Sequence, residues 1–391
     1  MEDIHGIAIV GGGISGLATS LALHRKGIRS LVLEKSETLR AEGVAITIHA
    51  NGWRALDSLG VGAELRELAT LITTDELRCL TRKDLIETLA NCLPPGAIRF
   101  GCHIVAIDAA DASSHGAVLT TVDGRTIKAK VLIGCDGANS VVAKFLGLSM
   151  PVQLPCLDIL GLTRYPQGHP FGSEYLNILG KGYAFGQIPI TENIVHFYVN
   201  MPNPSSTGAT NKDASRGKDH VLRKLEECQC PAQIVEAIRS IDQESMKILT
   251  KIWYMPPWRL VLGRFQRRTV TVAGDAMHVM GPFNGQGGSV ALEDAVVLAR
   301  SLSMAVPAGG GVDAAAMVMT DHGLQKEVIS AAIGRYVRER RPRVAKLSLE
   351  CFVIGTLLGT KSLVKRLICV GVLAVLGNMS GFKANYDCGP L

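Results

Sequence analysis

A glycine-rich turn near the start of the chain restricts its fold more than any other feature. An apolar run at residues 7–10 has the character of a buried strand, and Gly11, Gly13 and Gly16 follow it within VGGGISG. In a strand–turn–helix unit, the first glycine permits the tight turn, the second lets the backbone approach a pyrophosphate, and the third lets helix and strand pack closely. We therefore predict a Rossmann-like unit that binds a dinucleotide.

The residues after this turn support the same prediction. Their spacing predicts a helix over residues 16–26 that stops at Gly27, followed by a strand over residues 31–34. Glu34 ends this strand, where a carboxylate can accept hydrogen bonds from both ribose hydroxyls of an adenosine. Its charge would repel a 2′-phosphate, so we do not expect NADPH to bind at this site. Lys35 follows directly and belongs to the same candidate set.

The remaining chain has strand–helix–strand patterns at both ends and β-rich material between them. Asp123 and Gly124 give a strong hairpin signal. Polar residues 201–218 and the PAGGGV segment at 307–312 are expected to be loops. Helical spacing covers residues 53–68, 82–92, 219–227, 231–240 and the chain from about 290 onward, and strand patterns cover 104–107, 118–122, 126–130, 131–135, 157–200 and 270–273. This order predicts an α/β (α+β) fold with a discontinuous nucleotide domain.

The composition favours a folded chain without a metal site. Of the 391 residues, 47% are hydrophobic and 19% are charged, which argues against disorder. The ten cysteines show no metal-ligand grouping, and only one residue separates Cys228 from Cys230. We interpret them as reduced thiols of a cytoplasmic protein, and we expect no targeting peptide because a strand pattern begins at residue 7.

The formal net charge is +6, and part of it comes from residues 335–346. One interpretation of this basic stretch is an anionic partner or a membrane surface, but we favour a solvated helix face that ends at Pro342. Tyr336 is the only aromatic residue among the basic ones, so we expect no nucleic-acid partner. The apolar run at residues 367–376 is too short to span a bilayer, which predicts a buried or surface-lying helix without membrane contact.

Two further motifs give the chain a family resemblance. One is IGCDGANS at residues 133–140, and the other is VAGDAMHVMGPFNGQGGSVALEDAVVLA at residues 272–299. On these motifs the chain resembles the flavin monooxygenases related to salicylate, urate and 4-hydroxybenzoate hydroxylases. It is most similar to their plant branch, which also resembles zeaxanthin epoxidase. The resemblance covers nearly the whole chain and implies bound FAD.

The resemblance implies a discontinuous Rossmann-like FAD-binding domain, an inserted β-sheet substrate domain and a helical C-terminus. We assign the FAD-binding domain to residues 1–75, 76–155 and 263–345, the substrate domain to 156–262 and the C-terminal helical segment to 346–391.

The second motif implies the contacts that surround the flavin ring. In the family's pattern, Asp275 hydrogen-bonds a ribityl hydroxyl of FAD, and Pro282 stiffens the chain beside the ring. Gly285, Gly287 and Gly288 let the backbone touch the ring edge, where a side chain would clash. The helix that we expect near residue 290 directs its positive end at this loop, where it would stabilise the negative charge of reduced flavin.

Other positions follow from the resemblance. Arg82 matches the family arginine on the FAD phosphates and ribityl chain, and guanidinium suits phosphate well. Asp136 and Gly137 are implied near the pyrophosphate and the nicotinamide path. Ile104 is expected to offer backbone contact to the adenine. His278 is expected to be structural, as this histidine mostly is in the family.

Two departures from the family pattern affect the expected nicotinamide and flavin contacts. The first motif usually has an arginine three residues after its serine, where this chain has Ala143 with Lys144 beside it. The usual GAGI segment is replaced by GVAI at residues 43–46, with Ala45 near the ring. The first change bears on NADPH contacts, and the second bears on the position of the flavin.

The resemblance implies a single-component monooxygenase. NADPH (or NADH) would reduce FAD without a second dinucleotide domain, because no second glycine motif follows a strand. Oxygen would then form a flavin C4a-hydroperoxide that hydroxylates or epoxidises an aromatic or hydrophobic specialised metabolite. The protein has to keep this chemistry dry and orient the substrate.

The substrate pocket is expected between the strands at residues 157–200 and the Pro282–Phe283 loop. His196 and Tyr198 lie two apart on a strand and therefore share one face. His196 could deprotonate a phenol or enol if that face looks at the flavin, but the period of two fixes only relative direction. Tyr183 is a similar catalytic candidate. The expected apolar wall contains Leu160, Leu162, Phe185 and Ile188.

Two alternatives remain open from sequence. The first is a flavin oxidoreductase of other chemistry, such as oxidative rearrangement; the halogenase WxWxIP pattern is absent, since KIWYMPPW does not supply it. The second is a non-catalytic flavin-bound protein at a membrane surface. The substrate and the choice between monomer and homodimer are not fixed by the sequence.

Overall fold

A computed structural model gives the arrangement of most of the chain. It describes residues 3–39, 44–72, 75–109, 116–154, 156–172, 175–180, 182–202, 214–249, 252–305, 324–360, 362–377 and 384–391. Most of the loop expected at 201–218, the PAGGGV segment and Gly43 lie outside these residues.

The largest sheet is the predicted nucleotide-binding sheet. Its main strands lie in the order β17-β18-β9-β1-β2-β6, and β7 and β8 extend it beside β9. Neighbours from β18 to β6 pair in parallel, whereas β17, β7 and β8 pair antiparallel. The bounds are β1 Asp3–Val10, β2 Leu31–Leu33, β6 Ile98–Arg99, β7 Ile104–Ala109, β8 Ala117–Thr121, β9 Thr126–Gly134, β17 Gln266–Arg267 and β18 Val270–Val272. The Asp123-Gly124 hairpin and the initial βαβ unit are thereby confirmed.

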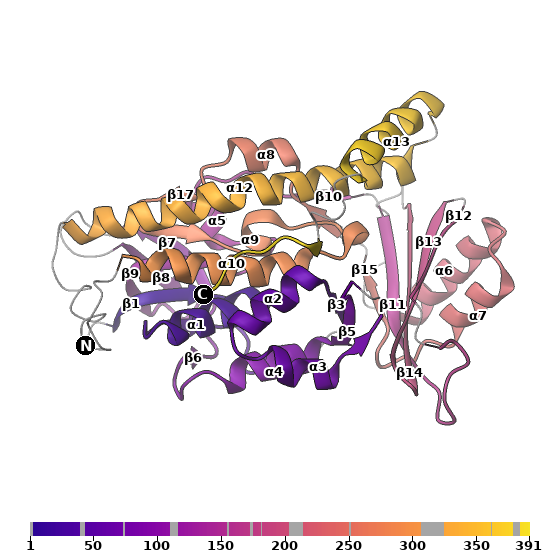
Figure 1. The fold of residues 1–391 in the computed structure, drawn as a ribbon, viewed down its shortest axis with the longest axis horizontal. Helices are drawn as coiled ribbons and strands as arrows, with labels where there is room; N and C mark the ends of the chain where they lie inside the picture. Colours follow the sequence, from indigo (N-terminus) through magenta and orange to yellow (C-terminus); the bar gives the residue numbers. More distant parts are fainter. Residues whose placement is uncertain are drawn as a thin grey trace.

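Helices from both ends of the chain cover this sheet. Helix α10 packs between α1 and α12, with α2 beside it (Figure 1). The helix expected at 53–68 is two helices, because the chain turns at Gly60 with a positive φ of 76°. The helices of this layer are α1 Ile14–Arg25, α2 Ala50–Ser58, α3 Gly62–Leu68, α4 Arg82–Asn91, α5 Val141–Phe145, α9 Asp275–His278, α10 Gly287–Ser303 and α12 Leu324–Gly359.

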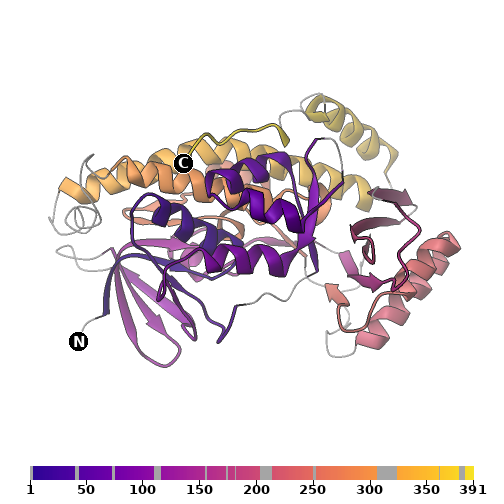
Figure 2. The ribbon, with the colours of Figure 1, turned by 60° about the horizontal axis from the view of Figure 1, so that its bottom comes forward.

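A five-stranded antiparallel sheet forms a second lobe (Figure 2). Its order is β12-β13-β14-β11-β15, and α6 and α7 cover one of its faces. The opposite face meets a three-stranded sheet of order β3-β5-β4. The bounds are β11 Cys156–Arg164, β12 Leu176–Gly180, β13 Tyr183–Thr191, β14 Ile194–Pro202, β15 Lys247–Leu249, α6 Ala214–Glu227, α7 Ala232–Arg239, β3 Ala45–Ile48, β4 Thr70–Leu71 and β5 Arg78–Thr81.

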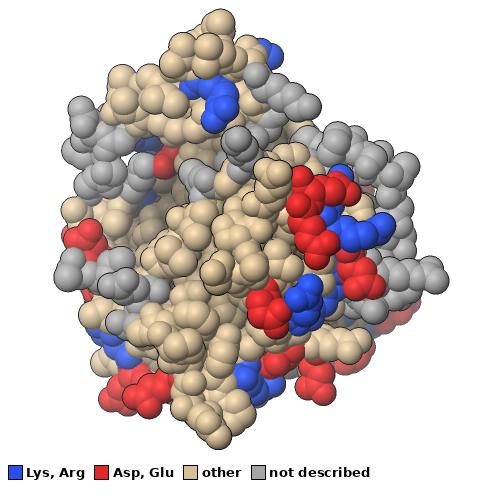
Figure 3. All heavy atoms as spheres, turned by 90° about the vertical axis from the view of Figure 1, so that its right-hand side faces the viewer, with Lys and Arg blue, Asp and Glu red and all other residues tan. Residues whose placement is uncertain are grey.

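The C-terminal part is arranged differently from our expectation. Helix α12 does not end at Pro342 but continues to residue 359, and α13 (Leu363–Gly377) then packs back on it. Helix α13 projects at the upper right of Figure 1 and lies at the top of Figure 3. Helix α8 (Pro257–Leu262) also packs on α12, and β10 (Val152–Leu154) pairs with β16 (Ile252–Tyr254) nearby. Among the described residues, no helix is long and apolar enough to cross a bilayer.

Candidate active site

The glycine turn has the geometry that its three roles require. Gly11 has φ +105°, and a Cβ there would lie 2.4 Å from the Cys135 carbonyl oxygen. A Cβ on Gly16 would lie 1.9 Å from the Gly11 oxygen, so helix and strand meet there without room for a side chain. A Cβ on Gly13 would meet nothing within 4 Å. The turn is thus packed at its base and open at the glycine that we assigned to the pyrophosphate.

Glu34 fixes the shape of this turn. Its buried carboxylate accepts hydrogen bonds from the Gly12 N–H at 2.7 Å and the Ser36 N–H at 2.9 Å. Lys35 is exposed next to it. The carboxylate therefore lies at the glycine turn and holds the turn's own backbone, while its contact with a ribose stays a prediction.

The first family motif supplies a carboxylate with an unmet hydrogen-bonding group. Asp136 Oδ2 accepts from the Val141 N–H at 2.6 Å, whereas its buried Oδ1 has no partner among the described residues. Burial raises the pKa of Asp136. Gly137, next along the chain, has φ +80° and open space where a Cβ would be. Because buried acceptors are normally paired, Asp136 is suited to a ligand hydroxyl. Ile104, at the start of β7, is buried in the hydrophobic core around the large sheet.

Arg82 and Asp275 are far apart in sequence but interact in the fold. Asp275 is solvent-exposed, yet the surrounding protein desolvates its carboxyl and raises its pKa, against the charges of His278 and Arg82. Desolvation lowers the pKa of Arg82, and the Asp275 charge acts in the opposite direction. A carboxylate that is accessible but closely surrounded lies in a concave site. A cation and an anion thus face the same region, as binding of FAD phosphates and ribityl hydroxyls requires.

The loop before α10, at residues 281–286, brings bare backbone to the site; it is the loop expected beside the flavin ring and is called the flavin loop below. Pro282 begins a short 3₁₀ turn, and Gly285 then adopts a left-handed conformation with φ +61°. Helix α10 starts at Gly287, earlier than the predicted residue 290, and no side chain caps its first turn. A Cβ on Gly288 would lie 2.8 Å from Ile46, whereas Gly287 has open space. The first N–H groups of a long helix therefore point at this loop, where they favour negative charge.

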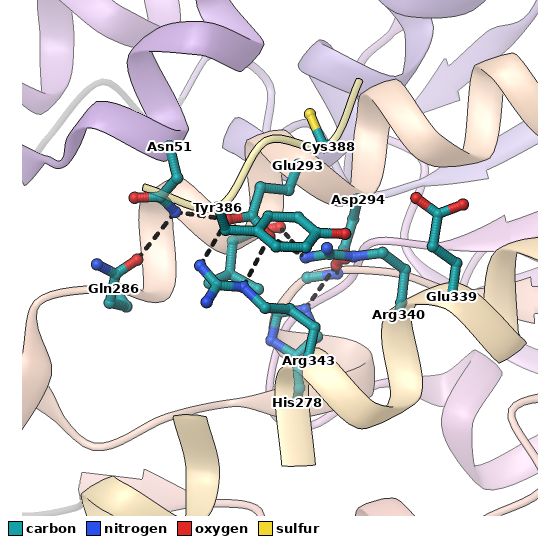
Figure 4. Close-up of polar contacts among 12 residues, drawn as sticks. Asn51, His278, Gln286, Glu293, Asp294, Glu339, Arg340, Arg343, Tyr386 and Cys388 are labelled. Atoms are coloured by element: carbon teal, nitrogen blue, oxygen red, sulfur yellow. Dashed lines mark hydrogen bonds and ion pairs between the residues drawn. The ribbon is translucent and has the colours of Figure 1, made fainter. Parts of the chain in front are cut away.

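A buried network of charges holds α10 in place (Figure 4). Glu293 and Asp294 are fully buried, and Arg340 of α12 contacts both, at 2.5 Å and 2.7 Å. Arg343 reaches Glu293 at 3.0 Å, and His278 Nε2 lies 2.6 Å from Asp294. Although burial raises the pKa of Asp294, the His278 and Arg340 charges hold it at about 2. His278 is therefore built into the framework, as expected.

This network corrects our interpretation of the basic stretch. We expected residues 335–346 to form a solvated face, but Arg340 is fully buried. Its acidic partners come from α10, far away in the sequence. The same network reaches the flavin loop, because the Asn51 amide donates to Glu293 at 2.5 Å and to the Gln286 side-chain oxygen at 3.0 Å.

The five-stranded sheet separates the two catalytic candidates. Tyr183 and Phe185 belong to the cluster that α6 and α7 cover, so both face away from the flavin-binding part. The prediction of Tyr183 as catalytic and of Phe185 as pocket wall is therefore wrong, because later helices bury that face. His196 and Tyr198 lie on the opposite face, with ring centroids 5.8 Å apart, and Tyr198 packs in the cluster shared with β3 and β5.

The inner face of the sheet carries isolated polar groups among apolar ones. His196 Nδ1 lies 2.9 Å from the Gly161 oxygen, and burial lowers the pKa of His196 to about 4. The Tyr175 and Tyr198 hydroxyls are 2.7 Å apart. Strand register places further inner-face residues at Asp158, Leu160, Leu162, Ile188 and Asn200.

Asp158 differs from the other inner-face groups in its titration. It is 5% exposed, accepts from the Asn200 amide, and burial raises its pKa to about 7. Our sequence analysis missed Asp158, Asn200 and Tyr175. A lone carboxylate within the apolar strand CLDILGL was the available signal.

Strand β3 connects this face with the flavin loop. Ala45 packs against the Ile188 and Tyr198 cluster. Thr47 lies on the same side of the strand, and its hydroxyl is 3.4 Å from where a Gly285 Cβ would be. The GVAI departure thus places the Ala45 methyl between sheet and loop.

On its other side the loop borders an apolar cavity. Phe283 lines a cavity of about 200 Å³ with residues of β10, β16 and α12. Its ring lies close to Gly355, where a Cβ would be 3.1 Å away.

The expected nicotinamide position at Ala143 lies in α5, where its N–H donates to Ser140, and the neighbouring Lys144 is exposed.

Comparisons with known proteins agree with this geometry. The family model of the FAD binding domain matches residues 5–78 and 79–313. The chain belongs to this FAD-binding family, and it is an FAD-dependent monooxygenase of the group that contains hydroxylases and epoxidases. It is 44% identical to Monooxygenase 1 of Arabidopsis thaliana, with both chains covered in full.

More distant relatives share the fold. FAD-dependent urate hydroxylase of Mycolicibacterium vanbaalenii is 25% identical over 75% of this chain and 78% of that protein. The structure of Klebsiella pneumoniae HpxO with FAD and uric acid superposes with a TM-score of 0.75 at 20% identity, covering 99% of this chain and 98% of the other. A salicylate hydroxylase substrate complex also gives 0.75, at 19% identity, covering 99% and 96%.

Proposed function

We propose that the chain uses NADPH or NADH and O₂ to hydroxylate or epoxidise an aromatic or other hydrophobic metabolite held on the inner face of the five-stranded sheet. The observation that carries this proposal is that face itself. It sets Leu160, Leu162 and Ile188 around two buried polar groups, His196 with a pKa of about 4 and Asp158 with a pKa of about 7. Such a surface suits an apolar molecule with one or two hydroxyl or carbonyl groups.

The residues present fit FAD. Gly13 leaves space for the pyrophosphate, Asp136 has an unpaired oxygen, and Arg82 and Asp275 bring opposite charges to one concave region. The uncapped start of α10 would favour negative charge on the ring. FAD supplies, when bound, the electron transfer from the nicotinamide and the activation of oxygen.

His196 is suited to orient a substrate hydroxyl. A carbonyl oxygen only accepts hydrogen bonds, so the contact with Gly161 requires the proton of neutral His196 to be on Nδ1. Nε2 then carries the lone pair. A pKa of about 4 makes this nitrogen a weak base, which favours acceptance of a hydrogen bond over complete removal of the proton. Asp158, with a pKa of about 7, is better matched to exchange a proton near neutral pH.

Relatives support the aromatic or hydrophobic class. Their names include a urate hydroxylase, a 3-amino-4-hydroxybenzoate 2-monooxygenase and a zeaxanthin epoxidase. The compounds in these three names, urate, an aminohydroxybenzoate and zeaxanthin, are all unsaturated organic molecules. In the present chain, strand register sets Leu160 and Leu162 on the inner face, with Lys247 of β15 opposite Leu160.

The test is oxygen-dependent oxidation of NADPH and NADH by the purified FAD-loaded protein with phenols, indoles and terpenoids. Mass spectrometry should find one atom of ¹⁸O from ¹⁸O₂ in the product. His196→Ala should lower kcat/KM about ten-fold or more, because a hydrogen bond to a buried group is lost. Tyr183→Phe, on the opposite face of the same sheet, is the matched control and should leave kcat/KM unchanged.

Two results would contradict the proposal. One is a protein that binds FAD but consumes no NADPH or NADH with any compound, as a non-catalytic flavin protein would. The other is an active enzyme in which Tyr183→Phe lowers kcat/KM as much as His196→Ala, since the substrate would then not lie on the inner face.

A further inference from the structure

Helix α13 presents its apolar side chains to solvent. The side chains of Leu363, Val364, Leu367, Ile368, Val370 and Val375 are between 53% and 70% exposed. Single exposed apolar residues are common, but a contiguous group of this kind marks an interaction site. The helix is beyond residue 313, where the match to the family model ends.

The exposed residues form one stripe. Leu363, Leu367 and Val370 follow helical spacing along one row, and Val364, Ile368 and Val375 follow it along the adjacent row. Cys369 lies on the other side of the helix and is buried. Helix α13 therefore packs on α12 through one side, while its continuous apolar side faces outward.

A second apolar group lies on α8, which also packs on α12. Trp258, Val261 and Leu262 are 50%, 54% and 79% exposed, and the Trp258 ring contacts Phe352 of α12 at a centroid distance of 5.4 Å. Both α8 and α13 lie along the upper edge of the molecule in Figure 1. Tryptophan with aliphatic neighbours is typical of surfaces that enter the boundary between lipid and water.

The charges around this stripe have one sign. Between Glu350 and Asp387 the sequence contains Lys361, Lys365, Arg366 and Lys383 and no acidic residue. Lys365 and Arg366 lie on α13 and are exposed beside the stripe. At the top of the molecule in Figure 3, the surface is mostly tan with a few blue lysine or arginine side chains, and no red acidic side chain is seen there. A second copy of the chain would bring like charges together, whereas anionic lipid headgroups would complement them.

The length of α13 determines how it could meet a bilayer. Its 15 residues extend about 22 Å, which is shorter than the roughly 30 Å hydrocarbon core. A helix of this kind lies in the plane of the interface, with its apolar side among the acyl chains and its basic residues at the headgroups.

We propose that α13 docks the protein on the surface of a bilayer containing anionic phospholipid. This inference replaces the expectation from sequence that membrane contact is absent, because the structure turns the apolar run outward. It does not depend on the proposed function.

The experiment is flotation of the full, FAD-loaded chain with vesicles of phosphatidylcholine alone or with one-third phosphatidylserine. The wild type should float with the anionic vesicles. Leu367→Glu and Ile368→Glu should each lower the partition coefficient at least ten-fold, with unchanged FAD content. Val122→Glu is the matched control, since Val122 is 66% exposed at the β8–β9 hairpin. Lys365→Ala and Arg366→Ala should each weaken anionic binding about five-fold.

Other outcomes would overturn the proposal. It fails if the wild type floats with neither type of vesicle, or if Leu367→Glu and Val122→Glu bind equally well. Sedimentation provides a further arm. A wild-type dimer that Leu367→Glu converts to monomer, without any vesicle binding, would assign the stripe to a second copy instead.

Discussion

Two buried aspartates in this chain titrate in opposite directions. Asp294 on α10 is fully buried, and Asp158 on β11 is 5% exposed. Asp294 has the Arg340 guanidinium and the His278 ring as partners, and a pKa of about 2. Among the described residues, the neutral Asn200 amide is the only side-chain hydrogen-bond partner of Asp158, and its pKa is about 7. Similar burial thus accompanies opposite pKa shifts, because the charge of the partners decides the sign of the shift.

The difference matches the two parts of the proposed active site. Beneath the flavin loop, Glu293 and Asp294 are paired with the permanent charges of Arg340 and Arg343, which fix the position of α10. On the inner face of the five-stranded sheet, the pKa of Asp158 is about 7 and that of His196 is about 4, so neither group carries a permanent charge at neutral pH. Groups of this second kind can accept a substrate's hydrogen bonds or protons without a fixed charge that repels an apolar molecule.

The largest effect should come from removing the cation of the paired region. Arg340→Met leaves Glu293 and Asp294 without their shared partner in a region that water does not reach. Loss of one partner from a buried ion pair costs about 3–5 kcal/mol. Urea denaturation should show this decrease in the free energy of unfolding, and gel filtration should show reduced FAD retention, because α10 carries the flavin loop.

Arg338→Met is the control for this prediction. Arg338 is exposed two residues earlier on the same helix, so its replacement should change stability by no more than about 0.5 kcal/mol. Equal stability of the two variants would show that the network does not hold α10, and the comparison between the two regions would lose its first half.

The next effect concerns pH and tests the second half. The pKa of Asp158 is raised in the folded protein, so the folded state binds this proton more tightly than the unfolded state. The stabilisation is complete below pH 4 and is lost as pH rises from about 4 to about 7, by up to about 4 kcal/mol. Asp158→Asn should abolish this slope, and at pH 8 the variant should be more stable than the wild type.

Asp294 should give the opposite profile. Its pKa is depressed, so its contribution is present above about pH 4 and is lost as pH falls toward 2. Asp294→Asn should therefore destabilise the protein at pH 7. Urea midpoints from pH 2 to 9 for both variants decide the matter, and parallel profiles would refute the distinction.

The nucleotide-binding fold was predictable because its signals are local. The close packing at Gly11 and Gly16 and the open space at Gly13 depend on the backbone of one turn, and the structure has all three features. The end of the basic helix was not predictable in this way. Proline inside a helix costs about 3 kcal/mol, but Arg340 and Arg343 bind acids of α10 on either side of Pro342. Sequence proximity gives no sign of those partners.

The substrate side shows the same limit. A period of two correctly places His196 and Tyr198 on one face, but it cannot say which face is covered. Helices α6 and α7, which follow these strands in sequence, cover the face of Tyr183 and so exclude it from the pocket. The Asp158–Asn200 pair depends on strand register between β11 and β14, which only the folded sheet establishes.

The smallest effect should arise where the paired region meets the C-terminal tail. The Arg343 guanidinium lies 4.4 Å from the Tyr386 ring centroid, and that of Arg340 lies 5.5 Å away. Tyr386→Leu keeps apolar contact but removes the ring quadrupole, which should cost about 1 kcal/mol. Tyr386→Phe keeps the ring and should match the wild type in urea. If Phe and Leu destabilise equally, the hydroxyl rather than the ring face matters, and the network ends at the arginines.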